Sequence, residues 1–198
     1  MTAYTDVIDN AYIKHGARVG LLANGIAKLM CMSEQEIELT TICSLLHDIG
    51  KVKIPANIFY KKGPLDKNEM DIIKLHPIYS YEYMKDCNYP EQYAHVVRAH
   101  HEKINGSGYP HKLYGEQIPI YARIIAVADI YDALTSDRPY RSKYSHSEAI
   151  DIMEAEAASN NIDNDVFLVL KQLTKIKNLK SMEFTEKQLP SLYNENIG

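Results

Sequence analysis

The sequence of 198 residues has little cysteine and no long hydrophobic run. Its three cysteines, Cys31, Cys43 and Cys87, are odd in number and widely spaced, which argues against a disulfide framework and against a thiolate zinc site. No apolar stretch reaches the length of a membrane span, and residues 1–10 have neither a basic region nor an apolar signal core. We therefore expect a cytoplasmic protein that does not enter a membrane.

The sequence also lacks a strong charge of either sign. A net charge of −4 argues against broad binding to polymeric nucleic acid or to anionic membranes, although it leaves room for a local cationic pocket. The length suits one domain, with a core over about residues 4–177 and a polar tail over residues 178–198.

Strands and internal repeats are absent from the pattern, whereas helical spacing of apolar residues runs through most of the chain. The fold class is therefore all-α, with six or seven helices. We expect them over about residues 4–30, 33–48, 67–87, 91–102, 120–137, 145–159 and 163–177. Three begin with a capping box, in which Ser or Asp is followed three residues later by Glu: Ser33 with Glu36, Asp66 with Glu69, and Ser145 with Glu148.

The chain is organised around the stretch His47-Asp48-Ile49-Gly50-Lys51, which closes an apolar helix. Two ionisable residues in apolar surroundings are costly unless a charged or hydrogen-bonding partner meets them. A lone His-Asp pair is more often a buried ion pair than a metal site. Here, however, further potential ligands recur in similar helical settings, namely His15, His76, His100, His101 and Asp129.

Asp129 is the second strong signal, because it lies within the apolar run Ile-Ala-Val-Ala-Asp-Ile and a cation is the simplest partner for it there. Asp132 follows one turn later on the same helical face. For His76, two interpretations stay open. Either Pro77 kinks one helix over residues 67–87 and aims His76 inward, or a helix ends before Pro77.

The doublet His100-His101 leads into residues 103–110, where Asn105, two glycines and a proline force a tight turn. Such a turn lets two consecutive imidazoles reach one centre. Polar surface is the simpler interpretation of the doublet considered alone.

Imidazole and carboxylate ligands without thiolate suit Fe or Mn, and also Zn, Co or Ni. Seven ligands exceed what one ion usually takes from protein, so two divalent ions fit better. Two ions about 3.5–4 Å apart can share a water, lower its pKa from about 15.7 towards about 7, and hold the attacking and leaving oxygens of a phosphoryl displacement. We assign His15, His47 and Asp129 mainly to one ion and His76, His100 and His101 mainly to the other, with Asp48 bridging.

Several neighbouring residues have the chemistry of substrate contacts or proton transfer. Lys51, Arg138 and Arg141 can meet phosphate oxygens. Asp132 can orient a water or a protonated leaving group, so the predicted catalytic set is Asp48, Lys51 and Asp132. Glu102 is expected to fix the tautomer of a histidine.

Four motifs stand in order along residues 15–165: His47-Asp48-Ile49-Gly50-Lys51, His76-Pro77, His100-His101-Glu102 with Gly106-Ser107-Gly108-Tyr109-Pro110, and Ala128-Asp129 through Asp132 to Arg138-Pro139-Tyr140-Arg141. Together they resemble the HD-GYP branch of the HD phosphohydrolase superfamily. The resemblance implies a helical, metal-dependent phosphodiesterase of bacterial signalling that hydrolyses cyclic di-GMP to pGpG or onward to GMP. It also implies substrate contacts at Lys51, Tyr109, Asp132, Arg138 and Arg141.

Three positions depart from the family pattern. Asn105 stands where the family usually has Asp, and Ser80 stands where it usually has Gly. Ala11 occupies the position at which some members carry a Glu and bind a third metal. The alanine favours two ions and argues against the second step, from pGpG to GMP.

Two other functions stay open at this point. The chain can act on another nucleotide, such as cyclic GMP-AMP, because a metal pair serves any phosphoester while pocket shape selects the base. It can also be a catalytically silent cyclic-dinucleotide receptor, although every ligand of the two-ion set is present. A homodimer, formed through the N-terminal helix, or signalling partner proteins are further possibilities.

Overall fold

The computed structural model describes residues 10–137 and 142–176. Over these two ranges the chain is helical and has no strand, which confirms the all-α prediction. The α-helices are α1 (Asn10–Leu29), α2 (Glu34–Leu46), α3 (Ala56–Phe59), α4 (Lys67–Ile73), α5 (His76–Asp86), α6 (Glu91–Arg98), α7 (Ile120–Thr135), α8 (His146–Ala158) and α9 (Asn164–Lys175), with two 3-10 segments, η2 (Ile49–Lys53) and η3 (Gly115–Gln117).

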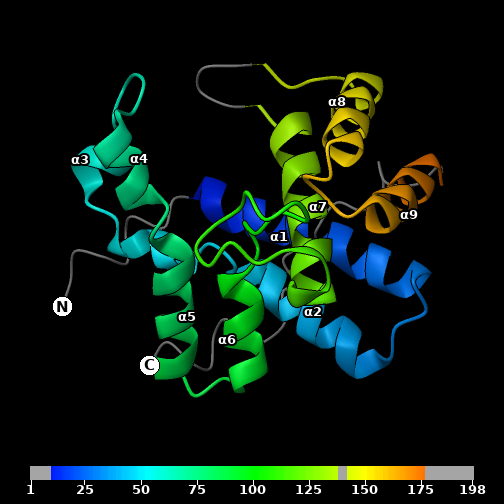
Figure 1. Cartoon of the computed structure of the whole chain (residues 1–198), viewed down its shortest axis with the longest axis horizontal. Coiled ribbons are helices and arrows are strands. Elements are labelled where there is room, and N and C mark those ends of the chain that lie inside the picture. Colours follow the sequence, from blue (N-terminus) through cyan, green and yellow to red (C-terminus); the bar gives the residue numbers. More distant parts are fainter. Residues whose placement is uncertain (1–9, 138–141, 177–198) are drawn as a thin grey trace.

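Helix α7 lies at the centre of the molecule, between α8 and α9 on one side and α1 and α2 on the other (Figure 1). Its apolar sequence explains this place, because Ile124, Ile125, Val127 and Ala128 are fully buried. Helix α1 packs along both α2 and α7. The end of α2 and the middle of α7, which carry the two strongest sequence signals, are therefore brought to a common interior.

The three predicted capping boxes are confirmed, and each starts a helix where expected. Ser33, Asp66 and Ser145 all accept a hydrogen bond from the backbone N–H three residues on, and the Glu at that position bonds back to the cap. These contacts satisfy N–H groups that have no partner within the helix.

The structure decides between the two interpretations of Pro77. Helix α4 ends at Ile73, and α5 begins at His76 with Pro77 in its first turn. A single kinked helix over residues 67–87 is therefore wrong. Proline is tolerated in a first turn because its missing N–H would have no helical partner there. This division and the four-residue α3 account for the helices beyond the six or seven expected.

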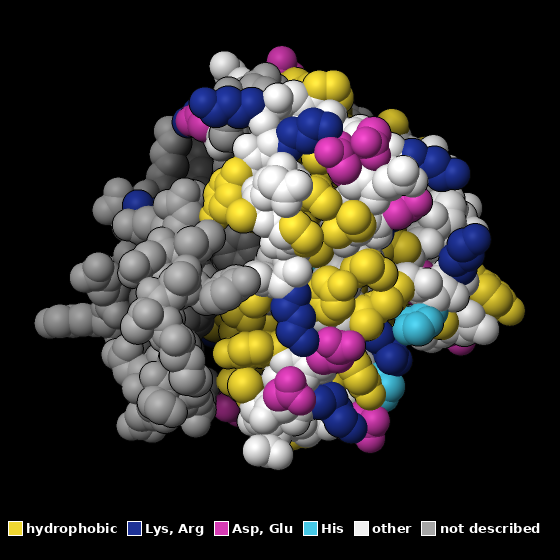
Figure 2. Space-filling view, turned by 90° about the vertical axis from the view of Figure 1, so that its left-hand side faces the viewer, with side chains coloured by type: hydrophobic (Ala, Val, Ile, Leu, Met, Phe, Trp, Pro, Cys, Tyr) yellow, Lys and Arg dark blue, Asp and Glu magenta, His cyan; other side chains and the backbone are white. Residues whose placement is uncertain are grey.

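Helices α3 and α4 lie at one edge of the molecule (Figure 1). They add little to the core, since α3 buries Ile58 and α4 buries none of its residues. Tyr60, Met70 and Leu75 remain exposed in this part. The space-filling view of that side shows hydrophobic side chains interspersed with acidic and basic ones (Figure 2). Among the described helices, none has both the length and the hydropathy to cross a bilayer.

Candidate metal centre

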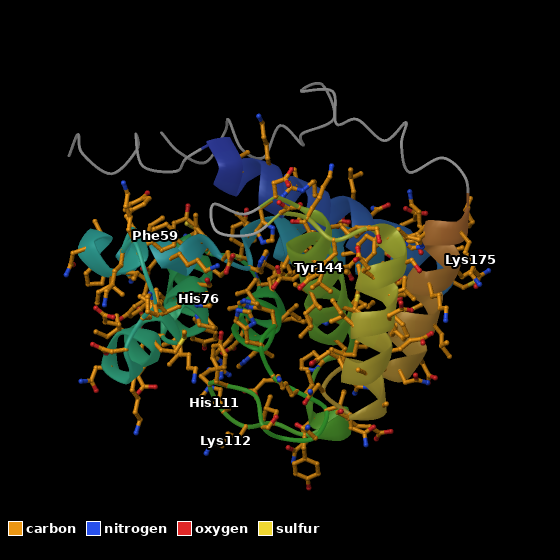
Figure 3. The ribbon with its side chains drawn as sticks, turned by 90° about the horizontal axis from the view of Figure 1, so that it is seen from above. Phe59, His76, His111, Lys112, Tyr144 and Lys175 are labelled. Carbon is orange, nitrogen blue, oxygen red and sulfur yellow. The ribbon has the colours of Figure 1, made fainter. Side chains whose placement is uncertain are left out.

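The structure brings all seven predicted ligands to one place, from five helices. His15 comes from α1, His47 and Asp48 from the end of α2, His76 from the start of α5, His100 and His101 from the turn after α6, and Asp129 from α7. His76 points inward from α5 toward the interior (Figure 3).

Two groups of ligand atoms share Asp48. Atoms of Asp48, His76, His100 and His101 lie within 4.8 Å of one another, and so do atoms of His15, His47 and Asp48. Asp129 adds to the second group, because its Oδ1 lies 3.2 Å from His15 Nε2. The division into two groups around one carboxylate has the same membership as the predicted two-ion site.

Backbone carbonyls hold three of the imidazoles. The Nδ1 atoms donate to the carbonyl three residues earlier: His47 to Ser44 at 2.7 Å, His76 to Ile73 at 2.8 Å, and His100 to Val97 at 2.5 Å. Each acceptor lies in the last turn of a helix, where carbonyls lack an intrahelical partner. Since a carbonyl can only accept, Nδ1 carries the hydrogen and each Nε2 is left with a lone pair for the interior.

The Nε2 lone pairs point toward one another, an arrangement that suits a bound cation. His76 Nε2 and His100 Nε2 are 3.2 Å apart, although both rings have their hydrogen on Nδ1. His47 Nε2 is buried, and within the described part of the chain it has no hydrogen-bond partner. Buried acceptors aimed at one another and at a carboxylate are costly unless a positive ion lies between them. The residues therefore fit a divalent metal centre.

The protonation states agree with metal binding. Burial lowers the pKa of His101 to about 3 and that of His100 well below its ordinary value. Burial alone would raise the pKa of Asp48, but the adjacent ammonium of Lys51 leads the opposing effects, and the pKa is held well below the ordinary range. Neutral imidazole and ionised carboxylate are the forms that bind divalent ions.

His15 differs from the other imidazoles. Burial lowers its pKa, but hydrogen bonds with Asp129 and Asp132 outweigh the burial and raise the pKa to about 9. Its Nδ1 lies 2.7 Å from Asp132 Oδ2, and its Nε2 faces Asp129 and Asp48. Without a metal His15 is thus an imidazolium between carboxylates, and an ion bound at Nε2 would replace that proton.

Lys51 and Tyr109 border the cluster. Lys51 Nζ lies 2.5 Å from Asp48 Oδ2, and its side chain remains 24% exposed. The ring of Tyr109 packs against that of His101, with 4.9 Å between centroids and an interplanar angle of 31°. Burial raises the pKa of Tyr109, so its phenol stays neutral and can donate a hydrogen bond. A Cβ on Gly108 would lie 2.4 Å from Lys103 N, so only glycine lets this loop fold back so tightly.

Glu102 does not fix a histidine tautomer, so that expectation is wrong. Its Oε1 accepts from His111 N–H at 2.7 Å, and its Oε2 accepts from Leu113 N–H at 3.0 Å. Figure 3 places His111 on the loop between α6 and α7. Because backbone carbonyls already satisfy three Nδ1 atoms, the carboxylate is left to anchor this loop.

Asp132 has contacts other than those predicted. Its side chain is 4% exposed, and its oxygens bond to His15 and to Arg18. The sequence offered one signal for Arg18, its place one turn after His15, and no role was predicted from it. Arg138 and Arg141 lie outside the described residues.

Ser80 is a second residue for which no role was predicted. It is fully buried, donates to the His47 carbonyl at 2.8 Å, and accepts from Gly50 N–H at 2.9 Å. Its hydroxyl thereby joins α5 to the His-Asp turn. The family's usual glycine would lack this bond.

The sequence is similar to a known family and to curated proteins. The model of the HD domain family matches residues 6–166. The chain is 36% identical over 155 residues to the cyclic di-GMP phosphodiesterase response regulator RpfG of Xanthomonas campestris pv. campestris, covering 77% of this chain and 40% of that protein. It is 35% identical over 193 residues to the 3'3'-cGAMP-specific phosphodiesterase 3 of Vibrio cholerae, covering 96% of this chain and 41% of that protein. The chain thus spans less than half the length of these curated relatives.

A solved structure shares the fold. The HDG"Y"P protein Bd1817 from Bdellovibrio bacteriovorus superposes with a TM-score of 0.68 at 21% identity, over 83% of this chain and 52% of that one. This likeness bears on the arrangement of the helices alone.

Proposed function

This chain belongs to the HD domain family, and from that premise we propose that it is a metal-dependent phosphodiesterase that hydrolyses cyclic di-GMP to pGpG. The observation that carries the proposal is the sharing of Asp48 between two groups of ligand atoms. A carboxylate in that position suits a pair of divalent ions better than a single one.

The proposed ion sites are those predicted from the sequence. His15, His47, Asp48 and Asp129 would hold one ion, and Asp48 with the remaining three histidines would hold the other. Bound there, two ions such as Fe or Mn supply an activated water and stabilise charge on the phosphoryl oxygens.

Side chains of the chain itself would bind the substrate. Lys51 is placed at the rim, where its ammonium can meet a phosphate oxygen while it keeps Asp48 ionised. Tyr109, which packs against His101, can donate a hydrogen bond from its neutral hydroxyl to the substrate. We infer that Arg138 and Arg141 complete the phosphate contacts.

Cyclic GMP-AMP is the second candidate substrate. The relative named for it covers 96% of this chain. Relatives named as cyclic di-GMP phosphodiesterases come from several bacteria, including Xanthomonas campestris and Thermotoga maritima, and favour cyclic di-GMP. The metal ligands cannot separate the two, since both substrates present the same phosphodiester.

The test is a competition assay on protein loaded anaerobically with Mn²⁺ or Fe²⁺. Equal amounts of cyclic di-GMP and cyclic GMP-AMP are supplied, and linear products are separated by chromatography. We expect pGpG to form at least about tenfold faster than the cyclic GMP-AMP product, a difference of about 1.4 kcal/mol in transition-state binding. Faster turnover of cyclic GMP-AMP would favour the second candidate.

Asp48→Ala is the matched inactive variant. It removes the carboxylate shared by both groups and should abolish hydrolysis of either nucleotide. An unchanged rate would contradict the proposed site. Tight binding of cyclic di-GMP by loaded wild type without turnover would instead indicate a receptor.

A further inference from the structure

Arg18 and Asp132 form a forked ion pair beside the candidate metal centre. Arg18 Nε donates to Asp132 Oδ1 at 2.5 Å, and Arg18 Nη2 donates to Asp132 Oδ2 at 2.9 Å. The same carboxylate accepts from His15 Nδ1 at 2.7 Å and from Ser136 Oγ at 3.2 Å. Both of its oxygens are thus committed to α1 and to its own helix.

The position of His15 within α1 explains why it needs a carboxylate. His47, His76 and His100 lie at or just beyond helix ends, where free carbonyls accept from Nδ1. His15 lies inside α1 (Asn10–Leu29), where carbonyls are taken by the helix itself. A side chain from a neighbouring helix must therefore orient the ring, and Asp132 is the one in contact.

Asp132 in turn needs a counter-charge. Its side chain is 4% exposed, and an ionised carboxylate so buried is costly unless it is paired and hydrogen-bonded. The planar guanidinium of Arg18 matches both oxygens at once, which fixes the plane of the carboxylate as well as its charge. Since Arg18 follows His15 by three residues, both side chains reach Asp132 from one face of α1.

We propose that Arg18 is a positioning residue which, through Asp132, sets the ring of His15 and with it the ion site of His15, His47, Asp48 and Asp129. The inference rests on the metal centre of the proposed function and deepens it. It assigns Asp132 to the support of a ligand, where the resemblance implied a contact with substrate.

The test is a metal titration on metal-free protein, with no nucleotide present. Wild type, Arg18→Ala, Arg18→Lys and Arg123→Ala are titrated with Mn²⁺ by calorimetry, and retained metal is counted after desalting. Arg123→Ala is the matched control, because it breaks a similar ion pair, with Asp163 at 3.1 Å, away from the seven ligands.

We expect wild type and Arg123→Ala to bind two ions with the same affinities. Arg18→Ala should keep one affinity and lose about 10- to 100-fold in the other, as removal of a ligand's outer partner typically does. Arg18→Lys keeps the charge without the fork and should fall between, which also covers the case in which Arg18→Ala fails to fold.

Two ions bound with wild-type affinity by both Arg18 variants would overturn the inference. An equal loss at both ions would do so too, since it would indicate a general structural role. Asp132→Asn separates the two roles of the carboxylate: loss of one ion supports the inference, whereas two intact ions with a raised KM would make Asp132 a substrate contact. If wild type binds two ions but hydrolyses no cyclic dinucleotide, the proposed function is refuted. The role of Arg18 is then still tested by the metal affinities of the variants.

Discussion

Among the proposed ligands, His15 is an imidazole whose pKa the fold raises, which favours its positively charged form. Its pKa lies at about 9 in the folded protein, against 6.5 ordinarily, because Asp129 and Asp132 outweigh the effect of burial. A pKa that is higher in the folded than in the unfolded protein stabilises the fold. The stabilisation is fully present at pH values below the unfolded pKa and is lost as the pH rises through the folded pKa. The metal-free protein should therefore lose up to about 3 kcal/mol of unfolding free energy between pH 6.5 and 9.

Urea denaturation in the presence of a chelator measures this loss. His15→Gln cannot titrate and is the control, so its stability should change less over the same pH window. Parallel pH profiles for the two proteins would show that His15 is not protonated in the metal-free fold. In wild type, Mn²⁺ binding below pH 9 should release a proton, which calorimetry in buffers of different ionisation enthalpy detects.

For single residues, the sequence predicted which side chains lie together at the candidate centre, but not which hydrogen-bond partners orient them. Buried ionisable residues in apolar helices were enough to nominate Asp48 and Asp129. The error at Glu102 and the missed role of Arg18 have one cause. Whether a histidine finds a free carbonyl depends on where its helix ends in the folded chain, which local sequence leaves uncertain by a few residues.

Among the elements, η2 and α5 pack so closely at Gly50 that a side chain cannot fit. A Cβ there would lie 2.2 Å from the His76 carbonyl oxygen and 2.4 Å from Ser80 N, both backbone atoms. Gly50→Ala must therefore shift the start of α5 and with it His76. We expect a loss of about 1–3 kcal/mol of stability by denaturation, together with weaker Mn²⁺ binding.

Gly20→Ala is the matched control for that substitution. The Cβ would meet side-chain atoms of Leu45 at 3.4 and 3.5 Å and the Thr41 carbonyl oxygen at 3.8 Å, all of which are ordinary contacts. Because Gly20 lies inside α1, alanine should stabilise the helix by about 0.5–1 kcal/mol. If Gly50→Ala also proved neutral or stabilising, the close packing of η2 against α5 would not hold.

The loop before Tyr109 is tied to the turn between α8 and α9 through Asn105. Its Nδ2 donates to Ser159 O at 3.2 Å and to Asn161 Oδ1 at 2.9 Å, while its Oδ1 accepts from Ser107 N–H at 3.0 Å. The family's usual Asp could not donate these two bonds. Asn105→Asp should therefore loosen the loop and raise KM for cyclic di-GMP several-fold, with a loss of about 1 kcal/mol of stability.

Steady-state kinetics and denaturation measure both effects. Asn68→Asp makes the same chemical change at an exposed position of α4 and should leave KM unaltered. An Asn105→Asp variant with wild-type KM and stability would show that the loop does not depend on these donated bonds.

Helix starts were predicted better than helix ends. Ser33, Asp66 and Ser145 mark starts through contacts within four residues, so the sequence alone carries the information. The end of α6 at Arg98, before the predicted residue 102, has no such local marker. It depends on how His100 and His101 turn into the centre, which is a tertiary requirement.

Across the whole molecule, the candidate centre depends on helices that are distant in sequence. His15 and Asp129 lie 3.2 Å apart between Nε2 and Oδ1, yet α1 and α7 are the first and seventh helices of the described chain. Hydrophobic periodicity predicted both helices but not that they pack together. Residue types and the resemblance to a family could still predict the ligand set, because neither requires knowing which helices pack together.

The proposed ligands among the described residues suit a particular number of ions, and that number predicts the product. Seven ligands in two groups around Asp48 suit about two Fe or Mn ions per chain. Ala11, one turn before His15, offers no ligand atom at the position where some family members bind a third metal. We therefore expect metal analysis of anaerobically purified protein to give about two ions, and pGpG to accumulate without GMP.

Ala11→Glu supplies the missing carboxylate on the same helix. If the third ion governs the second cut, this variant should bind one more Mn²⁺ in the calorimetric titration and convert part of the pGpG to GMP. Lys14→Glu places a carboxylate elsewhere on α1, with an even larger change of charge, and should do neither. GMP as the main product of wild type would mean that two ions suffice for both cuts, and the ion count would then not determine where hydrolysis stops.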